Sequence, residues 1–260
     1  MAVLAAVGTV LLIAFLLWFV VGTQRNISRG NELLRWLQGG LPLLGPRTTL
    51  RWLGTSAVQL DIVDAAAPFT RAQVNVVLEP RDLGWLWAWA RRRGRRDFLI
   101  LRGTLAGPPR FELEAGGRGW TGTERLDRLD QSAWQRTTWE DGAGTVDVAH
   151  TDRVDADDLA AVRALWQELV AASGGPWRLS IRHLEPQVEV HIEPPAVTPA
   201  PTSWPRPAGH EPAADRRPTG HEPTEREPAG RGGGEGADGE GAQALVGVFT
   251  ALGRLASRDT

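Results

Sequence analysis

"DADDLAAVRALWQELVAASGGPWRLSIRH" (residues 155–183) contains the clearest secondary-structure signal in the chain. Asp155 can cap a helix whose first turn holds Asp158, and Gly174-Gly175 would end it. The apolar residues that would share one face are Leu159, Val162, Leu165, Trp166, Leu169 and Val170. After the glycines, "WRLSIRH" alternates apolar and polar residues, as strands do. The segment therefore predicts an amphipathic helix that is followed by a strand.

Strand-like segments flank this helix on both sides. "WQRTTWE" (134–140) and "GTVDVAH" (144–150) precede it and are separated by an Asp141-Gly142 turn. "QVEVHIE" (187–193) follows the strand "WRLSIRH" and is joined to it through Glu185-Pro186. This half of the chain is therefore expected to run β-β-α-β-β.

The preceding half has the same expected order. Strands are predicted at 58–63 and 72–78, a helix at 82–93, and two strands around Gly107-Pro108-Pro109. The repeat is either a duplication or the common reuse of such units in α+β domains. In both cases the fold class is α+β: one domain over 48–194 with a mostly antiparallel sheet and two helices on one face.

The N-terminal segment has the length and composition of a membrane span. Residues 2–22 carry no charged side chain, and about 20 apolar residues cover a bilayer core of roughly 30 Å. Trp18 would lie near one interface. A cleaved signal sequence would need a basic start, a shorter apolar run and a cleavage site of small residues. We therefore expect residues 1–22 to be a retained single-pass anchor in the cell membrane.

A juxtamembrane segment, 23–47, follows the anchor. It places Arg25, Arg29 and Arg35 against Glu32, whereas the N-terminal flank has no basic side chain, so the N-terminus is expected outside and the domain in the cytoplasm. A short helix is expected at 31–45, closed by Gly39-Gly40. Its apolar residues would lie either in the headgroup region or on the domain: Leu33, Leu34, Trp36 and Leu37.

The helix predicted at 82–93 has two apolar stripes. Its boundaries are indicated by Asp82 as a candidate N-cap and Gly94 as a candidate C′ residue. The stripe expected to cover the sheet comprises Leu83, Leu86, Trp87 and Ala90. The other stripe comprises Trp85 and Trp89.

Basic residues continue the second stripe, and the candidate interaction surface consists of Trp85, Trp89, Arg92, Arg93, Arg95 and Arg96. Trp beside Arg suits an anionic lipid surface or a protein interface. Nucleic acid is disfavoured, because the chain is acidic overall and carries no recognition motif of the common modules. The interpretation that ranks first is that both tryptophans are core and that the arginines pair with acidic residues of the second half.

The charge distribution is uneven although the net charge is −2. Residues 23–110 contain 14 Arg and 6 acidic residues (net +8), whereas residues 111–195 contain 8 Arg and 16 acidic residues (net −8). The chain has no Cys and no Lys, which excludes disulfides, thiolate zinc sites, Schiff bases and P-loops. No hydrolase or metalloprotease motif occurs. We expect no cofactor.

The residues His183, Glu189, His191 and Glu193 could form either a metal site or a solvated strand face. The strand face is the preferred interpretation, so we expect no metal ligands.

The C-terminal part divides into a linker and a helix. Residues 195–242 are rich in Pro, Gly and charge, which predicts a disordered linker. Residues 243–260 regain an apolar period, with a docking face for a membrane or a partner's groove made of Leu245, Val248, Phe249, Leu252 and Leu255.

These features favour a membrane-anchored, non-enzymatic interaction or scaffold protein with an unidentified protein partner. The alternatives are an enzyme whose site is assembled from dispersed residues of the α+β domain and, less favoured, a nucleic-acid-binding domain.

Overall fold

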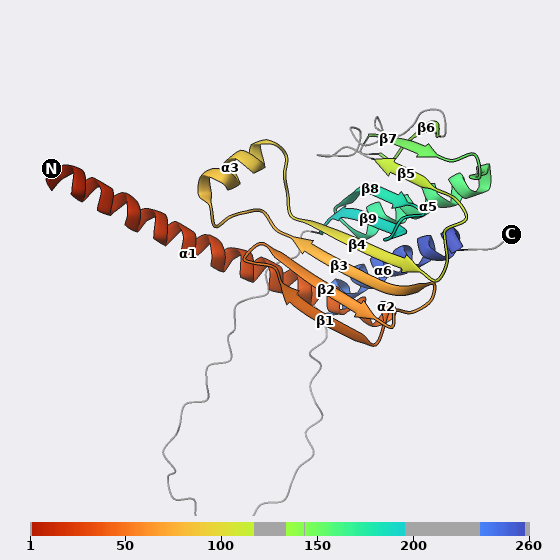
Figure 1. Cartoon of the computed structure of the whole chain (residues 1–260), viewed down its shortest axis with the longest axis horizontal. Helices are drawn as coiled ribbons and strands as arrows, with labels where there is room; N and C mark the ends of the chain where they lie inside the picture. Colours follow the sequence, from red (N-terminus) through yellow and green to blue (C-terminus); the bar gives the residue numbers. More distant parts are fainter. Residues whose placement is uncertain (1, 117–133, 143, 196–234, 258–260) are drawn as a thin grey trace, which may run out of the picture.

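The computed structural model describes residues 2–116, 134–142, 144–195 and 235–257, with side chains of 235–238 left out. A long helix, α1 (Ala2–Gln38), precedes an open antiparallel sheet and further helices, so the α+β prediction is confirmed (Figure 1). The strands are β1 (Arg47–Trp52), β2 (Ala57–Val63), β3 (Phe69–Val77), β4 (Phe98–Leu105), β5 (Leu113–Gly116), β6 (Gln135–Glu140), β7 (Thr145–His150), β8 (Gly175–Ile181) and β9 (Val188–Glu193). The remaining helices are α2 (Leu41–Leu44), α3 (Gly84–Arg92), α5 (Ala156–Ala172) and α6 (Glu235–Ser257).

The described strands form one sheet in the order β1-β2-β3-β4-β9-β8-β5-β7-β6. The first four strands are neighbours in sequence, but β4 pairs with β9 and β5 pairs with β7 and β8. The connection through Gly107-Pro108-Pro109 is therefore a crossover, while β8 and β9 form a hairpin. The two halves thus differ in pairing, and the structure does not show a duplication.

One face of the sheet is apolar across its width. The pairing registers align a buried row from β2 to β7: Leu60, Val74, Leu101, Val190, Leu179, Ala115 and Val148. Side chains alternate between faces along a strand, so the neighbouring residues form a polar row on the other face. That row includes Asp61, Gln73, Arg102, Glu189, Ser180 and Glu114.

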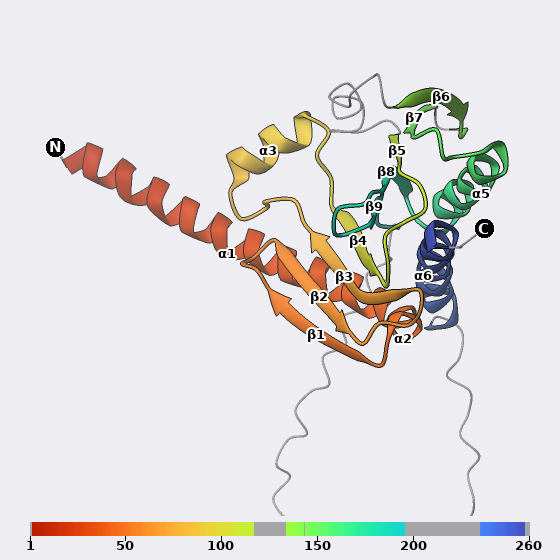
Figure 2. The same ribbon diagram turned by 45° about the vertical axis from the view of Figure 1, so that its right-hand side comes forward.

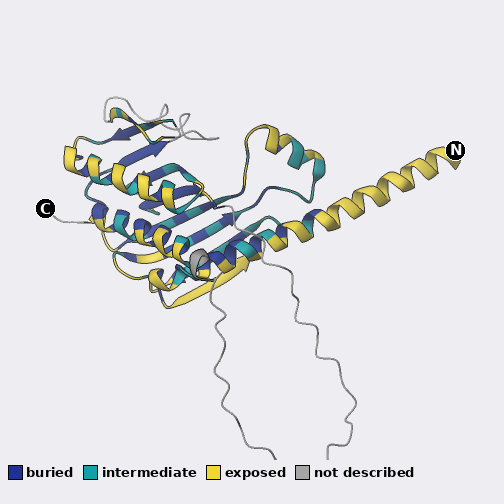
Figure 3. Cartoon of the chain, turned by 180° about the vertical axis from the view of Figure 1, so that it is seen from behind, coloured by how far each residue is buried: buried dark blue, intermediate teal, exposed yellow. Residues whose placement is uncertain are grey.

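Helices α5, α6 and the C-terminal part of α1 cover the apolar face (Figures 2 and 3). The predicted capping of α5 is confirmed, because Asp158 N donates to Asp155 Oδ1 at 2.7 Å and Asp155 N to Asp158 Oδ2 at 3.5 Å. Trp166 Nε1 also donates to Asp141 Oδ2 at 3.0 Å, which joins α5 to the β6–β7 turn.

The apolar face of α6 packs on the chain's own sheet, and this changes the interpretation of the C-terminal segment. Leu245, Val248, Phe249, Leu252 and Leu255 are all buried in the common core, and the Phe249 ring stacks on Phe69 with centroids 4.8 Å apart. The expectation that this face docks on a membrane or a partner's groove is therefore corrected. The physical reason is the width of the sheet: α5 does not reach β3 and β4, and the apolar side chains of these strands are buried by α6 instead.

Helix α6 begins at Glu235, within the segment that was expected to be a linker. Residues 196–234 of the predicted linker lie outside the described residues.

Helix α1 is continuous through the expected juxtamembrane segment and ends before Gly39-Gly40. Its first part is exposed and is long and apolar enough to span a membrane. Leu33, Leu34, Trp36 and Leu37 are buried in the domain core. These four side chains therefore pack on the domain and do not lie in the headgroup region.

Candidate functional site

Helix α3 stands apart from the sheet, beside α1 (Figures 1 and 2). The prediction that one of its stripes covers the sheet is wrong: of that stripe only Ala90 is buried, while Leu83, Leu86 and Trp87 are half-buried. The segments that lead into and out of α3 extend past the ends of β3 and β4, and so the helix lies beyond the sheet.

The chain leading into α3 contacts α1 at the end of its apolar part. A Cβ atom on Gly22 would lie 2.1 Å from the carbonyl oxygen of Arg81, and one on Gly84 would lie 2.7 Å from the Trp18 ring. At Gly22 the close approach to backbone requires glycine, and at Gly84 a Cβ atom would displace the Trp18 ring. Trp18 belongs to the segment predicted to span the membrane, and so the first turn of α3 lies at the level of its end.

A buried carboxylate holds α1 and both ends of the α3 segment together. Asp97 Oδ1 and Oδ2 each accept a bond of 3.0 Å from the Arg81 guanidinium, and Oδ1 also accepts from Glu79 N at 2.8 Å. From α1, Arg29 Nε lies 3.5 Å from Asp97 Oδ2, and Asn26 Oδ1 accepts from Arg81 Nη1 at 3.2 Å. These bonds fix α3 relative to α1.

The inner side of α3 is held by a second buried carboxylate. Glu79 accepts a hydrogen bond from Trp87 Nε1, and Arg91 Nη1 lies 3.1 Å from Glu79 Oε1. Arg91 therefore pairs with an acidic residue of the first half of the chain, and not with one of the second half. The N-cap expected at Asp82 is not formed. The N-cap residue of α3 is Leu83, which makes no capping bond with its side chain, and the Asp82 carboxylate instead accepts from Thr55 Oγ1 at 2.9 Å.

The outer side of α3 carries the predicted interaction surface. Trp85 is 71% exposed and Trp89 is 52% exposed, which rules out the interpretation that they are core. The Arg93 guanidinium lies 4.4 Å from the centre of a Trp89 ring. Arg96 Nη1 donates to the carbonyl oxygens of Arg91 and Arg95 at 3.1 and 2.9 Å, at the end of the helix.

The exposure of the basic residues completes this surface. Arg92, Arg93 and Arg96 are exposed and Arg95 is half-buried. The structure thus brings all six predicted residues to α3 and the loop that follows it.

A charged network on the polar face of the sheet was not predicted from sequence. Arg178 binds Glu114 at 3.2 Å and Glu189 at 2.8 Å, and Arg102 Nε lies 2.7 Å from Glu189 Oε2. Glu114 also accepts from Ser180 Oγ at 2.7 Å and from Arg182 Nε at 2.9 Å. The alternation within each strand is visible in sequence, but the register that aligns β4, β9, β8 and β5 is not.

Glu189 and His191 in this network have shifted pKa values. Burial raises the pKa of Glu189, but the bonds from His191 and Arg102 and the charge of Arg178 outweigh it and lower the pKa to about 2. Burial lowers the pKa of His191, and the charges of Arg178 and Arg102 add to this against the opposing effect of Glu189. The Nε2 N–H of His191 donates to Glu189 Oε1 at 2.6 Å.

This arrangement is that of a structural ion network. Ser180 donates to Glu114, a carboxylate that also binds Arg178 and Arg182. His183 is exposed on the β8–β9 turn, whereas His191 is buried. No group of three or more ligating residues that could hold a metal occurs among the described residues.

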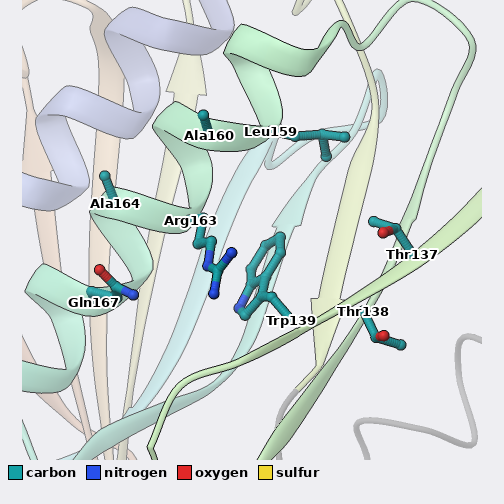
Figure 4. Close-up of a pocket in the computed structure, with 8 residues that line it drawn as sticks. All are labelled: Thr137, Thr138, Trp139, Leu159, Ala160, Arg163, Ala164 and Gln167. Atoms are coloured by element: carbon teal, nitrogen blue, oxygen red, sulfur yellow. The ribbon is translucent and has the colours of Figure 1, made fainter.

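A groove of about 400 Å³ lies between β6 and α5 (Figure 4). Its lining includes Thr137, Trp139, Ala160, Arg163, Ala164 and Gln167. None of these residues was singled out from the sequence as a binding residue.

Comparison with known protein families and with characterised proteins gives no match for this chain.

Proposed function

We propose that the protein is a membrane-anchored, non-enzymatic interaction or scaffold protein, and that α3 binds the anionic lipid surface beside the anchor. The observation that carries this proposal is the contact of Gly84 with Trp18. An aromatic side chain at the end of a membrane span lies in the headgroup region, and a helix that touches it lies at a similar depth.

The chemistry of the exposed face of α3 suits that position. Tryptophan rings are amphipathic and concentrate at membrane interfaces, where Trp85 and Trp89 would remove apolar surface from water. Each arginine near an anionic surface contributes about 1 kcal/mol. Arg92, Arg93, Arg95 and Arg96 would therefore add to binding by the tryptophans.

The role of α3 in this proposal is to orient the domain. The anchor would keep the chain in the bilayer, and the hydrogen bonds around Asp97 connect the α3 segment to α1. Binding of lipid by α3 would then fix the tilt of the whole domain and the direction in which its other surfaces face.

The orientation of the chain in the membrane is part of the proposal. We place the N-terminus outside and the domain in the cytoplasm of a cell whose inner leaflet is anionic. The arginines after the span support this, and the basic surface of α3 lies on the same side.

The absence of Cys from the sequence permits a direct test. Full-length Trp89→Cys protein would be labelled with an environment-sensitive dye and reconstituted into phosphatidylglycerol–phosphatidylcholine bilayers containing headgroup-labelled quencher lipid. The matched control is Leu184→Cys, because Leu184 is 79% exposed on the β8–β9 turn, at the opposite end of the strands from α3. We expect strong quenching at position 89 and little at position 184.

Equal quenching at the two positions would contradict the proposal. Proteolysis of intact cells tests orientation separately, and cleavage of the domain by protease added outside would reverse the assignment.

A further inference from the structure

The groove between β6 and α5 has the components of a peptide-binding site. Strand β6 is the last strand of the described sheet and pairs with β7 along one edge only. Half of the backbone N–H and C=O groups of an unpaired edge point outward and can bind another strand. Side chains of β6 and of α5 line a groove next to this strand (Figure 4).

Small residues on α5 keep the groove open. Ala160, Arg163, Ala164 and Gln167 form one exposed stripe on the helix, whereas Val162, Trp166 and Leu169 on another face are buried in the core. The two alanines leave the space that longer side chains would fill. A volume of about 400 Å³ accommodates one or two side chains of a ligand.

Two hydrogen-bond donors in the groove have no acceptor among the described residues. Trp139 is 7% exposed and its Nε1 is buried without a partner, whereas the neighbouring Trp166 donates to Asp141. Arg163 has no acidic partner among the described residues. In Figure 4, the two side chains point toward each other from β6 and α5.

A buried donor without an acceptor destabilises the folded protein. An N–H group beside a guanidinium can be satisfied by an anionic oxygen acceptor, which would bind both groups. The chemistry of the groove therefore indicates a ligand that carries a carboxylate.

We infer that this groove binds an extended acidic peptide, which adds as a strand to the free edge of β6 and places a carboxylate between Trp139 and Arg163. The unpaired strand edge explains why the ligand is a peptide and not an isolated small acid, because backbone bonds give such complexes much of their affinity. Alternate peptide side chains would enter the groove over Ala160 and Ala164.

The site is accessible when the protein is anchored. Figure 1 shows β6 and α5 at the end of the sheet remote from the apolar part of α1. The inference goes beyond lipid binding by α3 and does not depend on it.

The test uses full-length protein in nanodiscs and a displayed library of random octapeptides. We expect enrichment of peptides that combine β-branched residues with Asp, Glu or a C-terminal carboxylate. An enriched peptide should bind at least about tenfold more weakly to Arg163→Gln, the loss expected for one charge-assisted bond. Ala164→Leu should abolish binding by filling the groove.

The matched control is Ala171→Leu, the same substitution at an exposed α5 position that does not line the groove. It should leave peptide binding unchanged. Failure to enrich acidic peptides, affinity unaffected by Arg163→Gln and Ala164→Leu, or an equal loss in Ala171→Leu would overturn the inference. Quenching of labelled Trp89→Cys protein is measured in parallel in nanodiscs that contain anionic and quencher lipid, so failure of the lipid proposal is distinguished from failure of this one.

Discussion

Arg81 and Asp97 bind each other through two bonds of 3.0 Å, and this pair connects the two ends of the α3 segment beside α1. Asp97 is buried and also accepts the backbone N–H of Glu79. Removing it would leave Arg81 without its main partner and Glu79 N without an acceptor, although Arg81 would still lie 3.7 Å from Glu79 Oε2. The position of the proposed lipid-binding surface therefore depends on this carboxylate.

We accordingly predict that Asp97→Ala lowers the free energy of unfolding by about 2–3 kcal/mol, since charged hydrogen bonds are lost in a buried setting. Amide hydrogen exchange in 84–92 should accelerate more than exchange in α5. Asp152→Ala, at an exposed position, should change neither quantity. Unchanged exchange in 84–92 would show that α3 is held by other contacts.

The outer tryptophans of α3 should be dispensable for folding. Trp85→Ala with Trp89→Ala should change the free energy of unfolding by less than about 0.5 kcal/mol per site, as is usual for exposed positions. Denaturant unfolding of the protein in detergent measures this. By contrast, Trp87→Phe should destabilise, because Glu79 loses a hydrogen bond. Similar losses for all three substitutions would mean that the exposed side of α3 has a structural role.

Helix α6 should be essential for a stable domain. Phe249 is fully buried and stacks on Phe69, so Phe249→Ala should cost about 3–5 kcal/mol. The exposed Gln243→Ala serves as the control. A fragment of residues 48–194 should also fail to unfold cooperatively, because the core includes side chains of α1 and α6. A sharp calorimetric transition of that fragment would contradict the prediction.

The network around Glu189 should make stability fall in acid. The lowered pKa of Glu189, about 2 against an ordinary 4.5, contributes stability above pH 4.5 that is lost as the pH falls toward 2. The lowered pKa of His191 acts with the same sign, and its contribution is lost as the pH falls below 6.5. Urea unfolding at several pH values between 7 and 2.5 measures both.

Two variants separate these contributions. Glu189→Gln should reduce stability at pH 7 and flatten the dependence below pH 4.5, whereas His191→Gln should flatten the dependence that begins as the pH falls below 6.5. A dependence as steep as in the unmodified protein would assign the acid sensitivity to other groups.

The local elements of this protein are determined by short-range patterns in the sequence. Alternation in "VQLDIV" and "QVEVHIE" identifies β2 and β9, and the Asp155–Asp158 pair identifies the start of α5. The apolar run at 2–22 follows from the same kind of pattern, whereas the exposure of Trp85 and Trp89 did not, because the sequence left a core position open for both. Such patterns depend on residues a few positions apart, and so one sequence is enough to find them.

What covers each face was decided only by tertiary structure. The apolar stripe of α6 could have bound a lipid, a partner or its own sheet, because apolar surfaces attract one another without directional preference. The groove at Trp139 and the network at Glu189 depend on which strands are neighbours and in which register. Those pairings join residues that are far apart in the chain. The backbone hydrogen bonds that form them are the same for almost any side chain, so the sequence pattern of one strand does not identify its neighbour. The sequence therefore determined the faces of the helices and strands, and the packing of the whole chain determined which of them remained open.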